Sequence, residues 1–251
     1  MIYFIGAGPG DPDLITVKGA GILAQADVVI YAGSLVNPEI LRKCKPGAEV
    51  HNSAGMSLEE VLEVMFSAHR EGKAVARLHT GDPSIYGAIQ EQMDALSERG
   101  IEFSVIPGVS SFFAAAAAVP HELTLPEVSQ TVILTRLEGR TPVPDTEKLS
   151  DLARHRCTMC IFLSVSQIDR VVKELLEGGY PGETGVVVVE KASWPDQRVI
   201  RGNLLNIPEK VKEEGIKRQA LIMVGDVFGG GYSRSKLYDS NFSHGFREKA
   251  T

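Results

Sequence analysis

Three short loops of this 251-residue chain carry residue types that could hold a small ligand: Gly6–Asp13, His79–Gly87 and Pro107–Ser111. Each follows a short apolar run typical of a β-strand. Because α/β sheets bind ligands beyond the carboxyl ends of their strands, a common sheet would bring the three loops to one crevice. Turns and caps could explain each loop singly, and Ser110 is the expected N-cap of an alanine-rich helix over 110–118. Their convergence favours a binding site.

The first loop is glycine-rich, but it does not fit the dinucleotide-binding pattern G-x-G-x-x-G. Asp11 stands where the third glycine is required, and Pro9 lacks a backbone donor that a pyrophosphate would use. The carboxylates of Asp11 and Asp13 would also repel phosphate. The loop therefore favours a ligand that is not strongly anionic, with a simple strand-to-helix turn as the alternative.

The second loop has two interpretations. In the first, Asp82 is the N-cap and Pro83 the first residue of a helix over 84–98. In the second, Asp82 faces a ribose or amino group, while Gly81 and Ile85 line an adenine. The residue types alone leave both open.

In the second half of the chain, Arg136 and Arg140 lie just beyond a predicted strand. Arginine pairs with carboxylates in bidentate fashion, so these residues could hold an acidic substrate, although a solvated loop would also suit them. Trp194 is the only tryptophan; it either supports a flat ligand or covers the core.

A protein-bound metal and a hydrolase site are not expected. Cys157 and Cys160 have C-x-x-C spacing, but a strand would point them to opposite faces, and no second pair completes a zinc site. No Ser-His-Asp order or G-x-S-x-G motif is present.

The composition limits the class of protein. A net charge of -6 and a pI near 5.6 argue against nucleic acid as a partner. Three cysteines favour a reducing compartment, and no apolar run reaches the roughly 20 residues of a membrane span. We expect a cytoplasmic protein without a membrane anchor.

These motifs need an α/β framework, which the hydrophobic pattern predicts. The first half alternates strands and helices, whereas late strands of the second half follow too closely for helical crossovers. We expect two α/β domains, mostly parallel in the first and mixed in the second, with bounds of 1–120 and 121–231 and a tail over 232–251. The expected strands are 2–5, 27–31, 73–79, 103–106, 131–136, 158–163, 185–191, 198–201 and 220–224, and the expected helices are 16–25, 57–70, 84–98, 110–118, 147–154, 167–177 and 208–214.

The ordered set of glycine-rich loop, Gly81-Asp82-Pro83 and Pro107-Gly108-Val109 resembles the tetrapyrrole methylases, and the likeness covers Ile2 to Val227. The resemblance implies two α/β domains with S-adenosylmethionine in the cleft between them, held mostly by backbone. A homodimer is the family expectation. The residues that match the family's cofactor contacts are Pro9, Thr80, Gly81, Asp82, Ile85, Ser110, Ser111, Leu163, Ala192 and Ala220.

Two segments resemble the branch of the family that methylates C11 of precorrin-4: Thr135–Pro142, and the tail pair Ser235–Asp239 and His244–Arg247. The resemblance implies a tetrapyrrole substrate whose carboxylates are held by Arg136 and Arg140. Any cobalt would belong to the substrate ring.

Uroporphyrinogen-III methyltransferases carry an Asp and a Lys where this chain has Ala32 and Asn52, so that substrate is disfavoured. No catalytic residue is assigned, because the proton acceptor has no candidate. The alternatives are another corrin-ring methyltransferase, a diphthine synthase, or a nucleotide-binding module without turnover.

Overall fold

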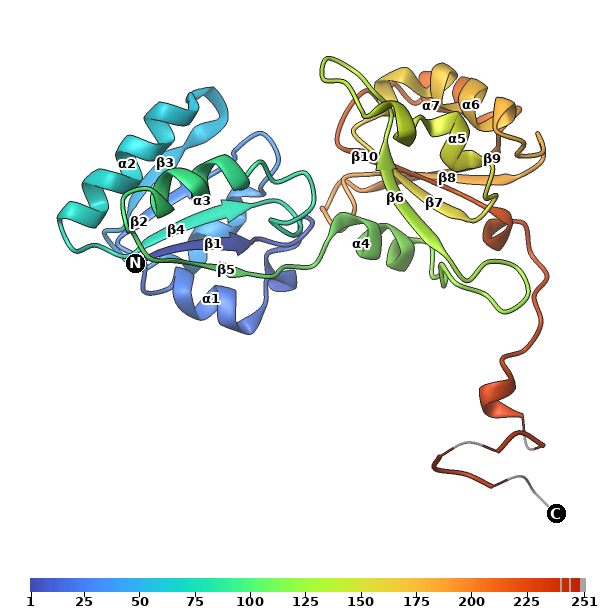
Figure 1. The fold of residues 1–251 in the computed structure, drawn as a ribbon, viewed down its shortest axis with the longest axis horizontal. Coiled ribbons are helices and arrows are strands. Elements are labelled where there is room, and N and C mark those ends of the chain that lie inside the picture. The colour runs from blue at the N-terminus through green and yellow to red at the C-terminus, as the bar shows by residue number, and fades with distance from the viewer. Residues whose placement is uncertain (240, 244, 249–251) are drawn as a thin grey trace. The chain divides into compact units, whose positions relative to one another are not determined.

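The computed structural model describes residues 1–239, 241–243 and 245–248, so His244 lies outside the described residues. The chain forms two compact units (Figure 1). The N-terminal unit comprises Met1–Ala115 together with Lys191–Gln197, and the C-terminal unit comprises Ala116–Glu190 and the chain from Arg198 onward. The domain bounds given above stay a prediction.

The N-terminal unit is built on a parallel five-stranded sheet with the order β3-β2-β4-β1-β5. Its strands are β1 Ile2–Gly6, β2 Val28–Tyr31, β3 Glu49–Asn52, β4 Val75–His79 and β5 Phe103–Ile106. The parallel sheet was predicted, but β3 was not. It is a short edge strand without a buried residue, so it lacks the apolar pattern that indicates a strand.

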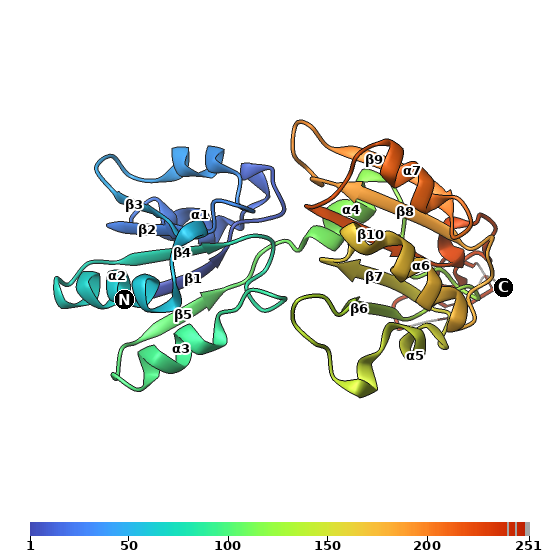
Figure 2. The same ribbon diagram turned by 90° about the horizontal axis from the view of Figure 1, so that it is seen from above.

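Helices cover both faces of this sheet (Figure 1), and its strand order from β3 to β5 can be followed in Figure 2. They are α1 Val17–Leu23, α2 Leu58–Arg70 and α3 Gln90–Ser97. Because side chains alternate along a strand, Phe4 enters the core that contains α2 and α3, while Ile5 enters the core that contains α1. Both faces are therefore buried, as a parallel sheet requires.

The C-terminal unit has a mixed sheet with the order β6-β7-β10-β8-β9, which confirms the expected change in sheet type. Only β6 and β7 are parallel; the other neighbours are antiparallel. Three helices pack on one face, where a single apolar core joins them to the strands (Figure 1). The elements are β6 Val132–Arg136, α5 Leu149–Ala153, β7 Thr158–Phe162, α6 Ile168–Glu177, β8 Gly185–Glu190, β9 Arg198–Asn203, α7 Ile207–Glu213 and β10 Ala220–Val224.

The prediction of a helix over 84–98 was wrong at its start, because α3 begins only at Gln90. The segment before it contains Tyr86 at φ 55° and Ala88 at φ 48°, a left-handed conformation that costs about 1–2 kcal/mol for each residue. Between them, a Cβ on Gly87 would overlap the Pro83 carbonyl oxygen. Asp82 and Pro83 therefore begin a strained loop rather than a helix.

The alanine-rich helix is confirmed as α4 Ser111–Ala118, and Ser110 directly precedes it. Among the described residues, no helix is both long and apolar enough to cross a membrane.

Candidate functional site

The three glycine-containing loops of the N-terminal unit meet at the carboxyl ends of β1, β4 and β5. A Cβ placed on Gly6 would lie 2.5 Å from the Gly108 Cα and 2.7 Å from the Gly81 carbonyl oxygen. A Cβ on Gly108 would overlap the same oxygen. Backbone therefore packs directly on backbone, and the predicted convergence of the loops is confirmed.

Hydrogen bonds lock these loops together. The Gly81 N–H donates to the Gly8 carbonyl at 2.8 Å. The Asp82 carboxylate accepts from the Gly108 N–H at 2.8 Å, and its other oxygen accepts from the Ser84 N–H at 2.9 Å. Asp82 thus joins the second loop to the third, a role that neither sequence interpretation included.

These bonds also keep Asp82 ionised. Partial burial acts to raise the pKa of Asp82, but hydrogen bonds from the Ser84 hydroxyl and from the Gly108 and Ser84 N–H groups hold that pKa below its usual value. A negative charge consequently stays at the centre of the three loops at neutral pH.

A fourth segment, Lys191–Gln197 between β8 and β9, completes this part of the N-terminal unit. The Trp194 indole N–H donates to the Pro9 carbonyl at 3.0 Å, and the Ser193 hydroxyl accepts from the Asp11 N–H at 3.0 Å. A Cβ on Gly10 would overlap the Trp194 ring. Trp194 therefore supports the first loop.

Asn37 is a second support that the sequence did not reveal. It is buried, and its side-chain amide donates to the Gly10 carbonyl at 2.8 Å. Its side-chain oxygen also caps the short 3-10 helix that begins at Pro38. Because Asn37 directly precedes Pro38, the sequence could have indicated its capping role. No local pattern could have indicated its hydrogen bond to Gly10.

The charges of these loops fit a neutral or cationic ligand. The three loop segments contain no Lys or Arg, whereas Asp11, Asp13 and Asp82 are acidic. Lys43 forms an ion pair with Asp13 at 2.9 Å, so Asp11 and Asp82 carry the remaining negative charge. His79 adds no positive charge, because burial and the nearby Arg77 charge lower the pKa of His79 to about 3. Because glycine has no side chain, the loops also present mainly backbone groups where they meet. These features suit adenosine and a sulfonium cation better than a phosphate-bearing dinucleotide.

The predicted cofactor residues of the N-terminal unit lie in or beside these loops. Pro9, Gly81, Ser110 and Ala192 are buried, and Thr80, Asp82, Ile85 and Ser111 are half-buried. The structure therefore brings the four segments together, while the contact of each residue with a cofactor stays a prediction.

In the C-terminal unit, other predicted residues share one edge of the sheet. Arg136 pairs with Phe162 in register, directly before Leu163, and Ala220 pairs with Glu190. Leu163 is 64% exposed and has a φ of 55°, an unusual combination for a large apolar residue. Gln219, at φ 53°, directly precedes β10 at the same edge. Left-handed residues other than glycine are often found at functional sites.

The two arginines proposed to bind substrate differ in their surroundings. The Arg136 guanidinium donates to the carbonyls of Thr141 at 3.1 Å and Pro142 at 2.6 Å, so it shapes its own loop. Arg140 is exposed and has no hydrogen-bond or ion-pair partner within the part of the chain that the structure describes. Of the two, Arg140 is the one with all its donors available.

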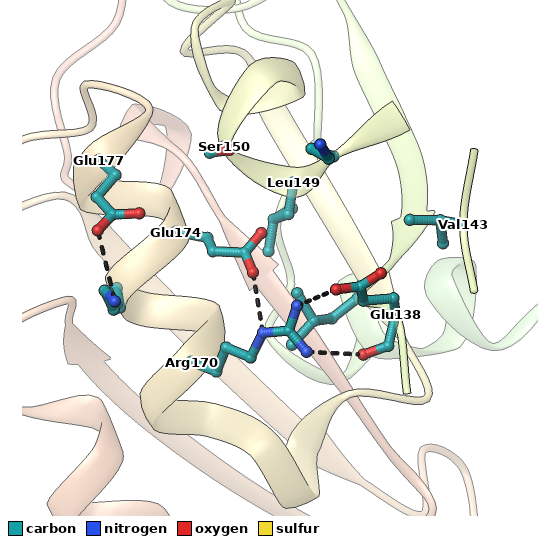
Figure 3. A pocket seen from close by; sticks show the side chains of 10 residues that line it. Glu138, Val143, Leu149, Ser150, Arg170, Glu174 and Glu177 are labelled. Atoms are coloured by element: carbon teal, nitrogen blue, oxygen red, sulfur yellow. Dashed lines mark hydrogen bonds and ion pairs between the residues drawn. The ribbon is translucent and has the colours of Figure 1, made fainter. Parts of the chain in front are cut away.

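A separate cavity of about 380 Å³ lies beside α5 and α6 of the C-terminal unit (Figure 3). Its charged walls are paired: Arg170 contacts Glu138 and Glu174, and Lys173 contacts Glu177 at 3.7 Å. Arg170 also donates to the Glu138 carbonyl, which ties the loop after β6 to α6. We interpret the paired residues that line this cavity as the support of that loop.

The cysteines behave as buried residues. Cys157 and Cys160 are free and buried, and burial raises the pKa of Cys160 to about 12. No group of three His, Cys, Asp or Glu residues suited to a metal occurs among the described residues.

The chain belongs to the tetrapyrrole (corrin/porphyrin) methylases, whose family model matches residues 1–208. It is therefore a methyltransferase. Among curated proteins it is 61% identical to a cobalt-precorrin-4 C(11)-methyltransferase of Methanocaldococcus jannaschii, over 98% of this chain and 96% of the relative. A protein of the same name from Priestia megaterium is 53% identical, over 98% and 97% of the two chains.

Solved structures give the same result. A cobalt precorrin-4 methyltransferase, described as a cobalamin biosynthetic enzyme, is 54% identical with a TM-score of 0.88, covering 90% of this chain and 95% of that one. A uroporphyrin-III C-methyltransferase from Thermus thermophilus, complexed with S-adenosyl homocysteine, is 29% identical with a TM-score of 0.75, covering 90% and 97%.

Proposed function

We propose that this enzyme methylates C11 of cobalt-precorrin-4 in cobalamin biosynthesis, with S-adenosylmethionine as the methyl donor. The observation that carries the proposal is the 61% identity, over nearly the whole chain, to a relative named for this reaction. The cobalt-containing substrate is favoured over metal-free precorrin-4, because a relative named for the latter, from Pseudomonas aeruginosa, is 49% identical. A uroporphyrinogen-III C-methyltransferase is only 33% identical, which agrees with the absence of an acid–base pair at Ala32 and Asn52.

The loops of the N-terminal unit are proposed to hold the cofactor. Bound S-adenosylmethionine would supply an electrophilic methyl group on a sulfonium ion. Thr80, Gly81 and Ser111 offer backbone and hydroxyl groups to the adenosine and methionyl parts, while Ile85 offers an apolar surface to the adenine. The Asp82 charge favours a cationic ligand by simple attraction. Leu163, Ala192 and Ala220 are proposed to contact the adenosyl group as well.

Rate acceleration in this proposal comes from placement. The loops are fixed by backbone packing, so the bound donor would have little freedom when the ring carbon attacks. Neutral, buried His79 cannot serve as a strong base, and no described side chain is assigned as the proton acceptor. Arg140, and with it Arg136, is proposed to hold the carboxylates of the tetrapyrrole. We further propose a cytoplasmic homodimer.

The test has two stages. Titration calorimetry of the pure protein with S-adenosylmethionine, S-adenosylhomocysteine and NAD should give binding of the first two and no response to NAD. Incubation with cobalt-precorrin-4 or precorrin-4 should then add one methyl group, located at C11 by NMR, with the cobalt complex turned over faster. Absence of S-adenosylmethionine binding, or methylation of another carbon, would contradict the proposal.

A further inference from the structure

A buried polar cluster, defined here as Ser53, Arg77, His79 and Gln92, lies on the face of the N-terminal sheet covered by α2 and α3. Arg77, His79 and Gln92 are at most 7% exposed. Burying polar side chains costs free energy unless they are hydrogen-bonded. Their presence here therefore calls for a structural or functional explanation. The loops described above do not include Arg77, Gln92 or Ser53.

The hydrogen bonds of the cluster run toward the strained segment that precedes α3. The Gln92 side-chain amide donates to the Ala88 carbonyl at 2.8 Å, and the Arg77 Nε donates to the Gln92 side-chain oxygen at 3.3 Å. The His79 ring lies within hydrogen-bonding reach of the Gly87 backbone, while its Nε2 is buried without a hydrogen-bond partner among the described residues. Buried side chains therefore hold the backbone of two neighbouring residues of the segment, Gly87 and Ala88.

The other end of the cluster is anchored to the sheet. Arg77 Nη1 donates to the Ser53 hydroxyl at 2.9 Å, and that hydroxyl donates to the Tyr31 carbonyl at 3.2 Å. The guanidinium thus joins Ser53, which follows β3, to Gln92 on α3. It also fixes the orientation of the Gln92 amide, because its donor takes the amide oxygen and leaves the NH₂ facing Ala88.

The segment held in this way needs support. Tyr86 and Ala88 on either side of Gly87 are both left-handed, and strain of this kind persists only where the surroundings fix it. Ile85, one of the proposed adenine contacts, lies in the same segment. A loop free to relax would move Ile85 and, through Pro83, the Asp82 carboxylate that joins the loops.

We propose that Gln92, oriented by Arg77, and His79 are positioning residues that hold Ser84–Ile89 in its strained conformation and so set the affinity for the methyl donor. The link to donor affinity rests on the proposed function; the hold on the segment does not. Neither residue need touch the cofactor. The cluster acts from the face of the sheet that α2 and α3 cover.

Gln92→Glu is the most direct test, because the new carboxylate still accepts from Arg77 but has no donor for the Ala88 carbonyl. The matched control is Gln25→Glu, which makes the same change at an exposed position just after α1. Hydrogen exchange of the Ser84–Ile89 amides in the cofactor-free protein should accelerate roughly tenfold in Gln92→Glu, and the dissociation constant of S-adenosylmethionine should rise by a similar factor. The control should change neither.

The outcomes separate the two proposals. Unchanged exchange in Gln92→Glu would overturn the positioning role, and so would faster exchange with unchanged donor affinity. Faster exchange in the variant, together with no S-adenosylmethionine binding by the unaltered protein, would leave the hold on the segment intact and contradict the proposed function. Should Gln92→Glu melt well below the unaltered protein, His79→Phe provides a second variant, which removes the bond to Gly87 while keeping a buried ring; faster exchange confined to the segment is again expected.

Discussion

The loop-bearing sheet edges of the two units are constructed in different ways. In the N-terminal unit, Gly6, Gly81 and Gly108 pack backbone against backbone, and the loops contain no Lys or Arg. In the C-terminal unit, the loop after β6 is held by side chains, with Arg136 on its carbonyls and Arg170 on Glu138. The first edge therefore has little tolerance for added atoms, whereas the second can change residue by residue. A fixed cofactor site and an adjustable substrate site would need these two properties.

The largest effect is expected from Gly108→Ala. Its Cβ would overlap the Gly81 carbonyl, and neither neighbour is a flexible side chain, so overpacking should cost about 1–3 kcal/mol of stability. We expect S-adenosylmethionine binding about 100-fold weaker by calorimetry. Gly21→Ala is the control, because nothing lies within 4 Å of its Cβ and a helical alanine should stabilise α1. Equal S-adenosylmethionine affinity in both variants would contradict the view that close backbone packing at this edge shapes the cofactor site.

Asp82→Asn should have the next largest effect. The amide retains one acceptor oxygen and the size of the side chain, but it lacks the charge that strengthens the bonds from Gly108 and Ser84. We expect binding of S-adenosylmethionine to weaken roughly tenfold. Adenosine should be affected less, because it has no positive charge for the Asp82 carboxylate to attract. An equal loss for both ligands would show that the charge itself is unimportant.

The same carboxylate predicts a pH dependence. The pKa of Asp82 is lower in the folded protein than its usual 3.8, so its contribution to stability is present above pH 3.8 and is lost as the pH falls through the folded value. Melting temperatures measured between pH 2 and 5 should therefore fall more steeply on the acid side for the unaltered protein than for Asp82→Asn. Parallel curves would contradict this.

At the C-terminal edge, Arg140→Ala should raise the KM for the tetrapyrrole about five- to tenfold through loss of one exposed charge pair with substrate. Donor affinity and melting temperature should stay unchanged, because Arg140 makes no hydrogen bond or ion pair within the described chain. Arg136→Ala is the informative comparison: it should also lower the melting temperature, since Arg136 holds the loop. Unchanged substrate affinity in Arg140→Ala would contradict the proposal that Arg140 binds a carboxylate of the substrate.

The smallest effect is expected from Trp194→Phe, which keeps an aromatic ring against Gly10 but deletes the donor to the Pro9 carbonyl. Loss of one neutral hydrogen bond should weaken S-adenosylmethionine binding by roughly threefold to tenfold. Leu205→Ala, at an exposed position, is a control. A variant that binds like the unaltered protein would limit Trp194 to packing.

The sequence predicted the parallel and mixed sheets and the meeting of three loops, because strand periodicity and loop position are local signals. It failed where distant contacts decide. Asp82 followed by Pro83 is a good helix start by local rules, yet Asp82 binds Gly108 and the chain turns through two left-handed residues. The contact of Trp194 with Pro9 joins residues 185 apart in the chain, so no local pattern could indicate it.

That long separation has a consequence for the order of events during synthesis. The N-terminal unit is complete only when Lys191–Gln197 joins it, and this segment is made roughly 80 residues after Ala115. At about 5–20 residues per second, the nascent chain spends several seconds with the first loop lacking Trp194 and Ser193. The nascent protein thus acquires its sheet well before the supports of its first loop, and a ribosome stalled before residue 191 would hold a sheet whose first loop lacks its hydrogen bonds to Ser193 and Trp194.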